Sequence, residues 1–294
     1  MTTLLSTLII LALASLLAAA AAGLGAILVG LGRGSAIATA TVEGLSSVTM
    51  PGATSSLRRA TGMGVLAGFA LLLAGLAVRA ILAGHAPWSN LHEFSLAFAA
   101  ALLGTYLLLA RNAPIDGLAP FAALLGAGLV VFALGLDDRI DPLVPALQNP
   151  LLLTIHVGTA ALAYAISGIA FLAAAAEIGQ VRSRDRIPLL PSAAVTRAVG
   201  HRAVLLSFPI LTIAIVLGSV WANLAWRSYW SNDPKELAAA ATWLVFGAYL
   251  HVAGRRDRWE RIAPWLIVLG FAGVLFTYIG AGLFFVGEHS YAAP

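Results

Sequence analysis

The chain contains no cysteine. It can therefore form no disulfide, hold no metal through a thiolate and perform no thiol exchange of its own, so any thiol chemistry must belong to a partner. Charge is also scarce, because 10% of the residues are charged, whereas a soluble domain carries about 25%. Lysine occurs once, as Lys235. The shortage of charge excludes a water-soluble fold.

Long apolar runs take the place of the missing charge. Hydrophobic residues make up 60% of the chain, and runs of about 20 residues, enough to cross a hydrocarbon core of about 30 Å, recur throughout. Because backbone polar groups in lipid must be satisfied within the segment, these runs predict helices. We expect an all-α integral membrane protein, a polytopic bundle of about eight transmembrane helices. The predicted spans are roughly 3 to 31, 63 to 84, 93 to 111, 117 to 135, 151 to 178, 201 to 222, 237 to 254 and 263 to 286.

The chain shows no division into parts. No internal repeat or low-complexity tract is evident, so residues 1–294 are predicted to form a single membrane domain. The apolar run from Thr3 to about Gly30 is too long for a signal-peptide core and lacks a basic leading region. We therefore expect it to be a membrane helix of the mature protein.

The loops between the runs alternate in charge. Basic loops follow the first, third, fifth and seventh spans, which indicates that they face the cytoplasm. Their residues are Arg33, Arg58, Arg59, Arg111, Arg182, Arg184, Arg186, Arg197, Arg255, Arg256, Arg258 and Arg261. The other loops are residues 85–92, the acidic stretch of Asp137, Asp138 and Asp141, and residues 223–236; with both termini they are predicted to face outward. The net charge of +4 is thus a topology signal, and we expect no nucleic-acid partner.

The outer loop at residues 221–236 is rich in aromatic side chains. One interpretation is an interfacial aromatic belt that leads into an Asp-Pro helix start. The other is a flat apolar platform that stacks on a planar ligand, with Lys235 or Arg227 meeting the carboxylates of that ligand. The aromatic and acidic residues concerned are Trp221, Trp226, Tyr229, Trp230, Asp233 and Glu236.

Three histidines lie at the ends of predicted spans or within them. His156 lies just inside the outer end of the fifth span, and His289 follows the eighth span at the same face. Two neutral imidazoles form a standard axial pair for haem iron, although polar side chains satisfied at the interface explain each histidine equally well. His251 falls deep in the seventh span, where an ionisable group indicates function. It shares a helix face with Trp243 and Gly247, and Gly247 leaves room there either for a flat macrocycle or for close helix packing.

The outer loop at residues 85–93 carries two further histidines. Pro87 and Asn90 are typical of a turn, and Ser89 or Asn90 is expected to cap the third span. His201, which lies among arginines at a cytoplasmic helix start, receives no role.

These motifs resemble the haem-handling, tryptophan-rich (WWD) family of cytochrome c assembly proteins, of the CcsA or ResC type in the system II pathway. The resemblance covers the chain from about residue 85 to its end. It is carried by Pro87, Ser89, Asn90, Leu91, Glu93, Trp221, Trp226, Ser228, Tyr229, Trp230, Asp233, Pro234, Lys235, Glu236, Trp243, Tyr249, Leu250, His251, Glu288, His289, Ser290 and Tyr291. The chain departs at Arg227, where the family usually has glycine, and at Asn232 and Ala238, where it usually has tryptophan.

The resemblance implies a set of ligands and partners. His156 and His289 would ligate haem iron at the outer face, and His251 would hold haem b within the membrane on its way across. The implied partners are a CcsB or ResB type membrane subunit, apocytochrome c with its Cys-x-x-Cys-His site, and a thiol-reducing partner. The chain would be the haem-handling subunit of a cytochrome c synthase in the bacterial plasma membrane, with its functional face outward. The other residues implied to contact haem are Trp221, Trp226, Tyr229, Trp230, Asp233, Lys235 and Trp243.

The expected function is haem binding, transmembrane delivery and presentation for attachment to apocytochrome c. Three alternatives stay open. A haem-binding or regulatory paralogue keeps the fold without the attachment role. A b-type electron-transfer subunit would pair histidines at matched depths in the membrane, whereas only His251 is deep. A transporter would show charged intramembrane residues and broken helices, of which Pro209 in the sixth span is the only sign.

Overall fold

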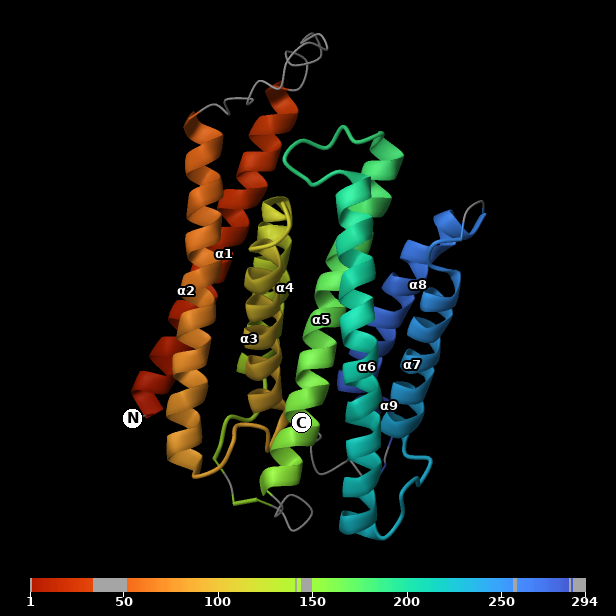
Figure 1. Cartoon of the computed structure of the whole chain (residues 1–294). Coiled ribbons are helices and arrows are strands. Elements are labelled where there is room, and N and C mark those ends of the chain that lie inside the picture. Colours follow the sequence, from red (N-terminus) through yellow and green to blue (C-terminus); the bar gives the residue numbers. More distant parts are fainter. Residues whose placement is uncertain are drawn as a thin grey trace.

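The computed structural model describes residues 2–33, 52–140, 142–143, 150–255, 258–285 and 287, and every regular element within them is helical. Long helices stand side by side and alternate in direction (Figure 1). They are α1 (Thr2–Arg33), α2 (Gly52–Ala83), α3 (Leu91–Ala110), α4 (Ala119–Leu134), α5 (Pro150–Ser183), α6 (Ala193–Trp226), α7 (Pro234–Val252) and α8 (Arg258–Leu275). A short 3-10 turn, Asp116–Leu118, precedes α4, and a π-helical segment, Phe276–Gly280, joins α8 to α9 (Ala281–Phe284).

Seven of the described helices are long and apolar enough to cross a membrane. The chain is therefore a multi-pass membrane protein. The remaining predicted span corresponds to α7, which has 19 residues and carries the polar residues Lys235 and Glu236 in its first turn. It runs antiparallel to α6 and α8 (Figure 1). The prediction of an all-α polytopic bundle is confirmed.

Several helices extend beyond the predicted apolar runs. α2 begins at Gly52, and α6 spans Ala193–Trp226, where the prediction gave 201 to 222. The added turns carry polar groups such as the Arg58 guanidinium, which donates to the Asp116 carboxylate at 2.8 Å. Hydropathy marks the part of a helix that suits lipid, whereas caps and hydrogen bonds set where the helix ends.

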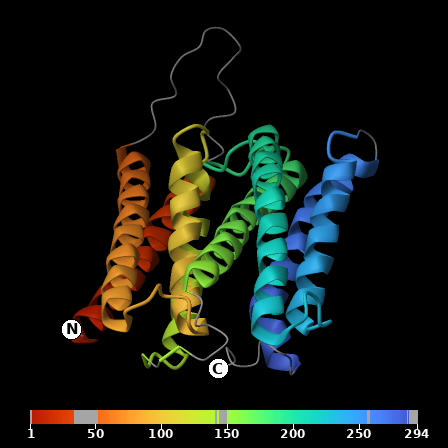
Figure 2. The same cartoon turned by 60° about the horizontal axis from the view of Figure 1, so that its bottom comes forward.

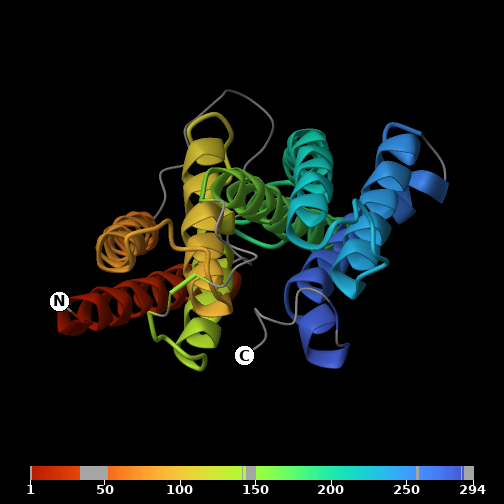
Figure 3. The same cartoon turned by 90° about the horizontal axis from the view of Figure 1, so that it is seen from below.

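The helices are arranged in a row. Seen from below, the α1–α2 hairpin lies at one end and the α7–α8 pair at the other, with α3, α4, α5 and α6 between them (Figure 3). α5 crosses the bundle obliquely (Figure 2) and contacts α3, α6 and α8. The α2–α3 and α6–α7 connections, both predicted to face outward, lie at the lower end of Figure 1, where α1 begins. We refer to this end of the bundle as the outer end.

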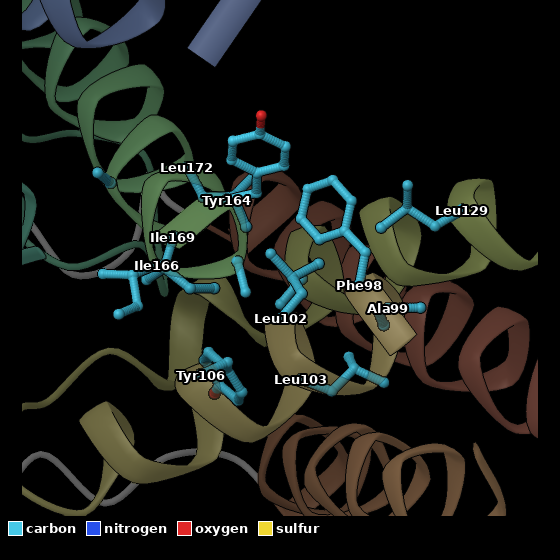
Figure 4. Close-up of a cluster of buried hydrophobic side chains, with 14 of the residues drawn as sticks. Phe98, Ala99, Leu102, Leu103, Tyr106, Leu129, Tyr164, Ile166, Ile169 and Leu172 are labelled. Carbon is cyan, nitrogen blue, oxygen red and sulfur yellow. The ribbon is translucent and has the colours of Figure 1, made fainter. Parts of the chain in front are cut away.

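The core is densest where α3, α4 and α5 meet. Phe98 and Leu102 of α3 lie between Leu129 of α4 and Tyr164 of α5 (Figure 4). Gly168 of α5 lies so close to α3 that a Cβ at this position would lie 2.6 Å from Leu102 Cδ1. Small residues at helix contacts let backbones approach closely in membrane proteins. This packing fixes α5 against α3, and with it the histidine near the outer end of α5.

Candidate functional site

A cavity opens at the outer end of the bundle. Its empty volume, counted with the open mouth, is about 1190 Å³. Its walls come from the α2–α3 loop, α3, α5, α6, the α6–α7 loop, the start of α7 and the π-helical segment. The lining is mostly apolar and aromatic and includes Trp88, His156, Tyr164, Trp221, Trp230 and Lys235. Clefts of this character, with a few polar groups among apolar ones, are typical ligand sites.

His156 is held in the cavity wall by its neighbours on α6. Its Nδ1 lies 3.0 Å from the Ala214 carbonyl oxygen. Because a carbonyl only accepts, Nδ1 must carry the proton, and the lone pair of the neutral ring is then on Nε2. The imidazole also stacks on Trp221, with ring centroids 5.8 Å apart and planes at 25°. Gly218 gives the ring its space, since a Cβ there would lie 2.7 Å from His156 Cε1.

The aromatic residues in the last turns of α6 and in the α6–α7 loop are placed differently from one another. Trp221 is buried, while Tyr229 and Trp230 line the rim of the cavity and are 60% and 41% exposed. Trp226 does not line the cavity. It meets Trp221 edge to face, with centroids 5.3 Å apart, and packs in the cluster that includes Leu143. The structure therefore gives Trp226 the role of a support behind Trp221.

Two residues at which the chain departs from the family pattern share a backbone conformation that favours glycine. Arg227 has φ 61° and Asn232 has φ 60°. Arg227 ends α6 with its backbone N–H donating to Asn223, and Asn232 accepts from Trp230 Nε1 at 3.0 Å. The loop therefore keeps a glycine-type turn at Arg227, and the Asn232 amide holds the Trp230 indole. The third departure, Ala238, lies half-buried in α7.

The start of α7 combines a cap with the only lysine of the chain. Asp233 Oδ1 accepts from Lys235 N at 2.8 Å, and Glu236 Oε2 accepts from Asp233 N at 3.1 Å, which is a capping box. Asp233 is buried, so the structure gives it a local role. The half-buried Lys235 lines the cavity ahead of the predicted span 237 to 254. Burial lowers the pKa of its ammonium group, and the nearby Asp233 carboxylate opposes that shift.

The inner wall of the cavity contains polar groups that the sequence pattern did not reveal. The π-helical segment places Thr277 and Tyr278 in the lining. Tyr278 hydroxyl is hydrogen bonded to Ser95 Oγ of α3, and its ring packs against Phe94 at a centroid distance of 5.3 Å. π-helical turns are rare and occur often at functional sites. Hydropathy alone contains no sign of this insertion.

The α2–α3 loop also supplies cavity residues that sequence reasoning did not select as site residues. Trp88, Ser89 and Asn90 all line the cavity. Asn90 caps α3, as expected, by accepting from Glu93 N at 2.9 Å. Neither histidine of this region lines the cavity. His85 Nδ1 lies 2.9 Å from the Ala86 carbonyl oxygen, and Nδ1 of the buried His92, in the first turn of α3, lies 2.8 Å from the Ala133 carbonyl oxygen of α4. The sequence did contain a sign of this site, because the aromatic residue Trp88 stands directly before Ser89 and Asn90, the residues expected to cap the third span.

The other predicted site residues lie elsewhere. Trp243 packs between helices, with its Nε1 donating to Thr212 Oγ1 at 2.8 Å and its ring stacked on Phe208 at 5.1 Å. His251 is exposed in the last turn of α7, at the opposite end of that helix from Lys235. His289 lies outside the described residues. The structure thus brings together His156, Trp221, Tyr229, Trp230 and Lys235, and leaves Trp243 and His251 outside the cavity.

Comparison with known sequences adds independent information. A family model described as Cytochrome C assembly protein matches residues 88–289. The chain is 35% identical over 253 residues to the cytochrome c biogenesis protein CcsA of Parasynechococcus marenigrum (strain WH8102), covering 75% of this chain and 82% of that protein. It is 37% identical over 232 residues to CcsA of Chlamydomonas reinhardtii, covering 75% of this chain and 65% of that protein.

Comparison with solved structures concerns the fold. The chain is similar to Cytochrome c Heme Lyase CcmF with a TM-score of 0.62, covering 93% of this chain and 46% of that one. The sequence identity is 20%, so the likeness shows a shared fold alone. The cavity lining, from Trp88 to Tyr278, falls entirely within the stretch matched by the family model.

Proposed function

Since this chain belongs to the cytochrome c assembly protein family, we propose that its outer cavity binds haem and presents it for covalent attachment to apocytochrome c. The chain is a membrane protein of c-type cytochrome biogenesis. The observation that carries the proposal is the imidazole of His156, whose Nδ1 proton is directed to the Ala214 carbonyl within an aromatic cavity. Metal-binding histidines commonly donate their second ring nitrogen in this way, which keeps the lone pair for the metal.

The cavity residues fit haem in their chemistry. Trp230 offers exposed apolar ring surface to a flat macrocycle, and the buried Trp221 supports the His156 imidazole by stacking on it. The ammonium group of Lys235 offers a charged donor to a propionate carboxylate. Because Tyr229 and Trp230 are exposed at the rim, an edge of the ligand would stay accessible to a client.

We further propose that His289 is the second histidine that would hold haem iron. Gly287, two positions earlier in the sequence, lies so close to Asp233 that a Cβ at Gly287 would lie 2.3 Å from Asp233 Oδ2. The chain therefore passes the start of α7, next to the cavity residue Lys235, shortly before His289. Two neutral imidazoles, one from α5 and one from this C-terminal segment, would then hold the iron.

The attachment chemistry would come from haem and from the client. Haem b would supply vinyl groups, and apocytochrome c would supply the thiols of its Cys-x-x-Cys-His site. Each S–H adds across one C=C, so that a C–S bond forms, the hydrogen goes to the neighbouring carbon, and no electron is gained or lost. This chain has no cysteine, so its residues bind, orient and shield. A thiol-reducing partner would keep the client thiols available.

We further propose that haem reaches the cavity by way of His251. This imidazole is exposed in the last turn of α7, and an exposed ionisable group in a membrane helix is costly unless something covers it. We propose that a CcsB or ResB type subunit packs over the His251 side chain. The charge alternation of the loops supports an orientation with the cavity facing outward, and we propose the bacterial plasma membrane as its location.

Absorption spectroscopy tests the haem site directly. The chain, expressed with its membrane partner and purified in detergent, is compared oxidised and reduced with a variant that carries His156→Ala and His289→Ala. We expect a bis-histidine haem spectrum that the double variant loses. A matched control is His201→Ala. His201 lies near the start of α6, away from the α6 residues that line the cavity, and its Nδ1 is 3.2 Å from the Tyr249 hydroxyl. A spectrum that the double variant retains would reject the assignment of these ligands.

A further inference from the structure

The same three-residue sequence occurs in two of the loops that line the cavity. A Trp-Ser-Asn sequence occurs at Trp88 and again at Trp230. Both tryptophans line the cavity, the first from the α2–α3 loop and the second from the α6–α7 loop. Each sequence leads into a helix, α3 or α7, whose first turn contains a glutamate, Glu93 or Glu236.

The glutamate binds the serine in the same way in both turns. Glu93 Oε2 accepts from Ser89 N at 2.7 Å and from Ser89 Oγ at 2.8 Å. Glu236 Oε2 accepts from Ser231 N at 2.9 Å and from Ser231 Oγ at 3.2 Å. Because two donors of one serine meet a single carboxylate oxygen, the backbone of each turn is held next to its tryptophan. The two turns therefore share a serine–glutamate contact that holds the backbone beside a tryptophan of the cavity wall.

The turn at Trp88 has an additional anchor. Arg79 of α2 donates from Nε to the other oxygen of the same carboxylate, Glu93 Oε1, at 2.6 Å. Its remaining nitrogens donate to the backbone carbonyls of Asp138 at 2.8 Å and Arg139 at 3.1 Å. Both charged side chains are fully buried, at 1% and 0% exposure. Arg79 lies outside residues 88–289, so the N-terminal hairpin helps to build a site that otherwise falls within the family region.

The indole of Trp88 itself has a donor to offer. Its Nε1 is buried and has no acceptor among the described residues. By contrast, Trp230 Nε1 donates to Asn232, so its polar atom is satisfied within its own turn. Buried donors nearly always have a hydrogen-bond partner in proteins. Because Trp88 lines the cavity, a polar group of a bound ligand can be the partner of its Nε1.

We propose that Trp88 is a direct ligand contact, the second aromatic wall of the haem site, and that Arg79 and Glu93 are positioning residues that act through it. The inference rests on the proposed function, because it takes haem to be the ligand of this cavity. It assigns a role to a residue in neither the tryptophan-rich loop nor the set of iron ligands. A planar ligand would then lie between indoles supplied by two different interhelical loops.

Haemin binding by the purified full chain in lipid nanodiscs tests the contact. The dissociation constant is measured from Soret absorbance for wild type, Trp88→Ala, Trp88→Phe and Trp88→Leu. We expect Trp88→Ala and Trp88→Leu to bind about tenfold more weakly, and Trp88→Phe, which keeps a ring, to lose less than about threefold. Trp265→Ala is the matched control, because Trp265 lies outside the cavity and contacts Arg182; it should bind like wild type.

A double-mutant cycle tests the positioning role. Glu93→Gln should weaken haemin binding in the wild-type background and add no further loss in the Trp88→Ala background, since it acts through that indole. An equal loss in both backgrounds would overturn the positioning role. Wild-type affinity in both Trp88→Ala and Trp88→Leu would overturn the contact while the proposed function stands. A wild-type chain that binds no haemin would overturn the proposed function and this inference with it.

Discussion

Gly218 of α6 occupies the position from which any larger residue would contact the His156 ring of α5. A Cβ on Gly218 would lie 2.7 Å from His156 Cε1 and 3.3 Å from Nδ1. Real Cβ atoms do not approach this closely, so the imidazole would have to move. The hydrogen bond from Nδ1 to the Ala214 carbonyl would be the first contact to suffer. The site thus depends on the lack of a side chain at Gly218 as much as on His156.

The first prediction follows from this contact. Gly218→Ala should displace the His156 ring and reduce haem content at least about tenfold, since a residue that would hold the iron is displaced. Haem content is measured from the absorption spectrum of the purified chain. Gly158→Ala on α5 is the control, because a Cβ there would meet nothing within 4 Å. An alanine in the interior of a helix is favoured over glycine by about 0.5–1 kcal/mol, so this control should bind fully and unfold no earlier.

The second prediction concerns the buried ion pair between Arg79 and Glu93. Removing one partner leaves a buried charge without compensation, which typically costs about 3–5 kcal/mol. Arg79→Met should therefore lower the thermal unfolding midpoint of the chain in nanodiscs markedly. Both side chains are buried, so solvent screening does not weaken the pair.

The exposed pair of Arg139 and Asp137 provides the comparison for that experiment. Its side chains are 74% and 53% exposed, and exposed pairs contribute little to stability. Asp137→Asn should leave the unfolding midpoint unchanged. If the Arg79 and Asp137 variants unfolded at the same temperature, the buried pair would not have the stabilising role that its burial indicates.

Part of this architecture was predictable from hydrophobic runs and part was not. The runs predicted the helices, because lipid allows few alternatives for the backbone. The loop predicted at residues 221–236 is shorter in the structure, because Trp221 and Trp226 lie in the last turns of α6 and α7 begins at Pro234. The pattern did not separate Trp226, which supports Trp221, from Trp230, which lines the cavity. That distinction depends on how the loop folds back after Arg227, and residue type alone does not specify it.

Long-range pairs and backbone irregularities were beyond the sequence pattern for a different reason. Arg79 meets Glu93 across a helix boundary, and Ser95 meets Tyr278 from the far end of the chain. Neither pair has a periodic signature, because each is created by packing. The histidines show the same limit: His156 lies in the cavity wall and His251 does not, although hydropathy assigned both to membrane helices.

The third prediction concerns pH. Burial lowers the pKa of Lys235 below that of an ordinary lysine, which is about 10.4. As the pH rises through this lowered pKa, Lys235 loses the charge that would meet a propionate, so haemin affinity should fall at a pH where most lysines are still charged. Titration of the dissociation constant between neutral and alkaline pH measures the effect. Lys235→Arg should keep its affinity to higher pH, because a guanidinium stays charged.

The neutral variant separates this lysine from other titrating groups. Lys235→Met should bind more weakly than wild type at neutral pH and show a flatter pH dependence over the same range. Iron ligation by His156 would remain available in all three chains, so alkaline changes at the iron should be common to them. An identical pH dependence in the Met and wild-type chains would remove Lys235 from the ligand site.

The fourth prediction uses the left-handed backbone at Arg227. A residue with a Cβ at φ 61° is disfavoured by roughly 1–2 kcal/mol, whereas glycine adopts this conformation freely. Arg227→Gly should therefore unfold at a higher temperature than Arg227→Ala, which keeps the strain and removes the same guanidinium. The two variants also lose the same charge, so a haemin affinity that fell equally in both would assign Arg227 a contact with ligand carboxylates. An affinity that fell only in Arg227→Gly would instead show that a rigid backbone at this position matters for ligand binding. Equal unfolding temperatures of the two variants would contradict the backbone strain at position 227.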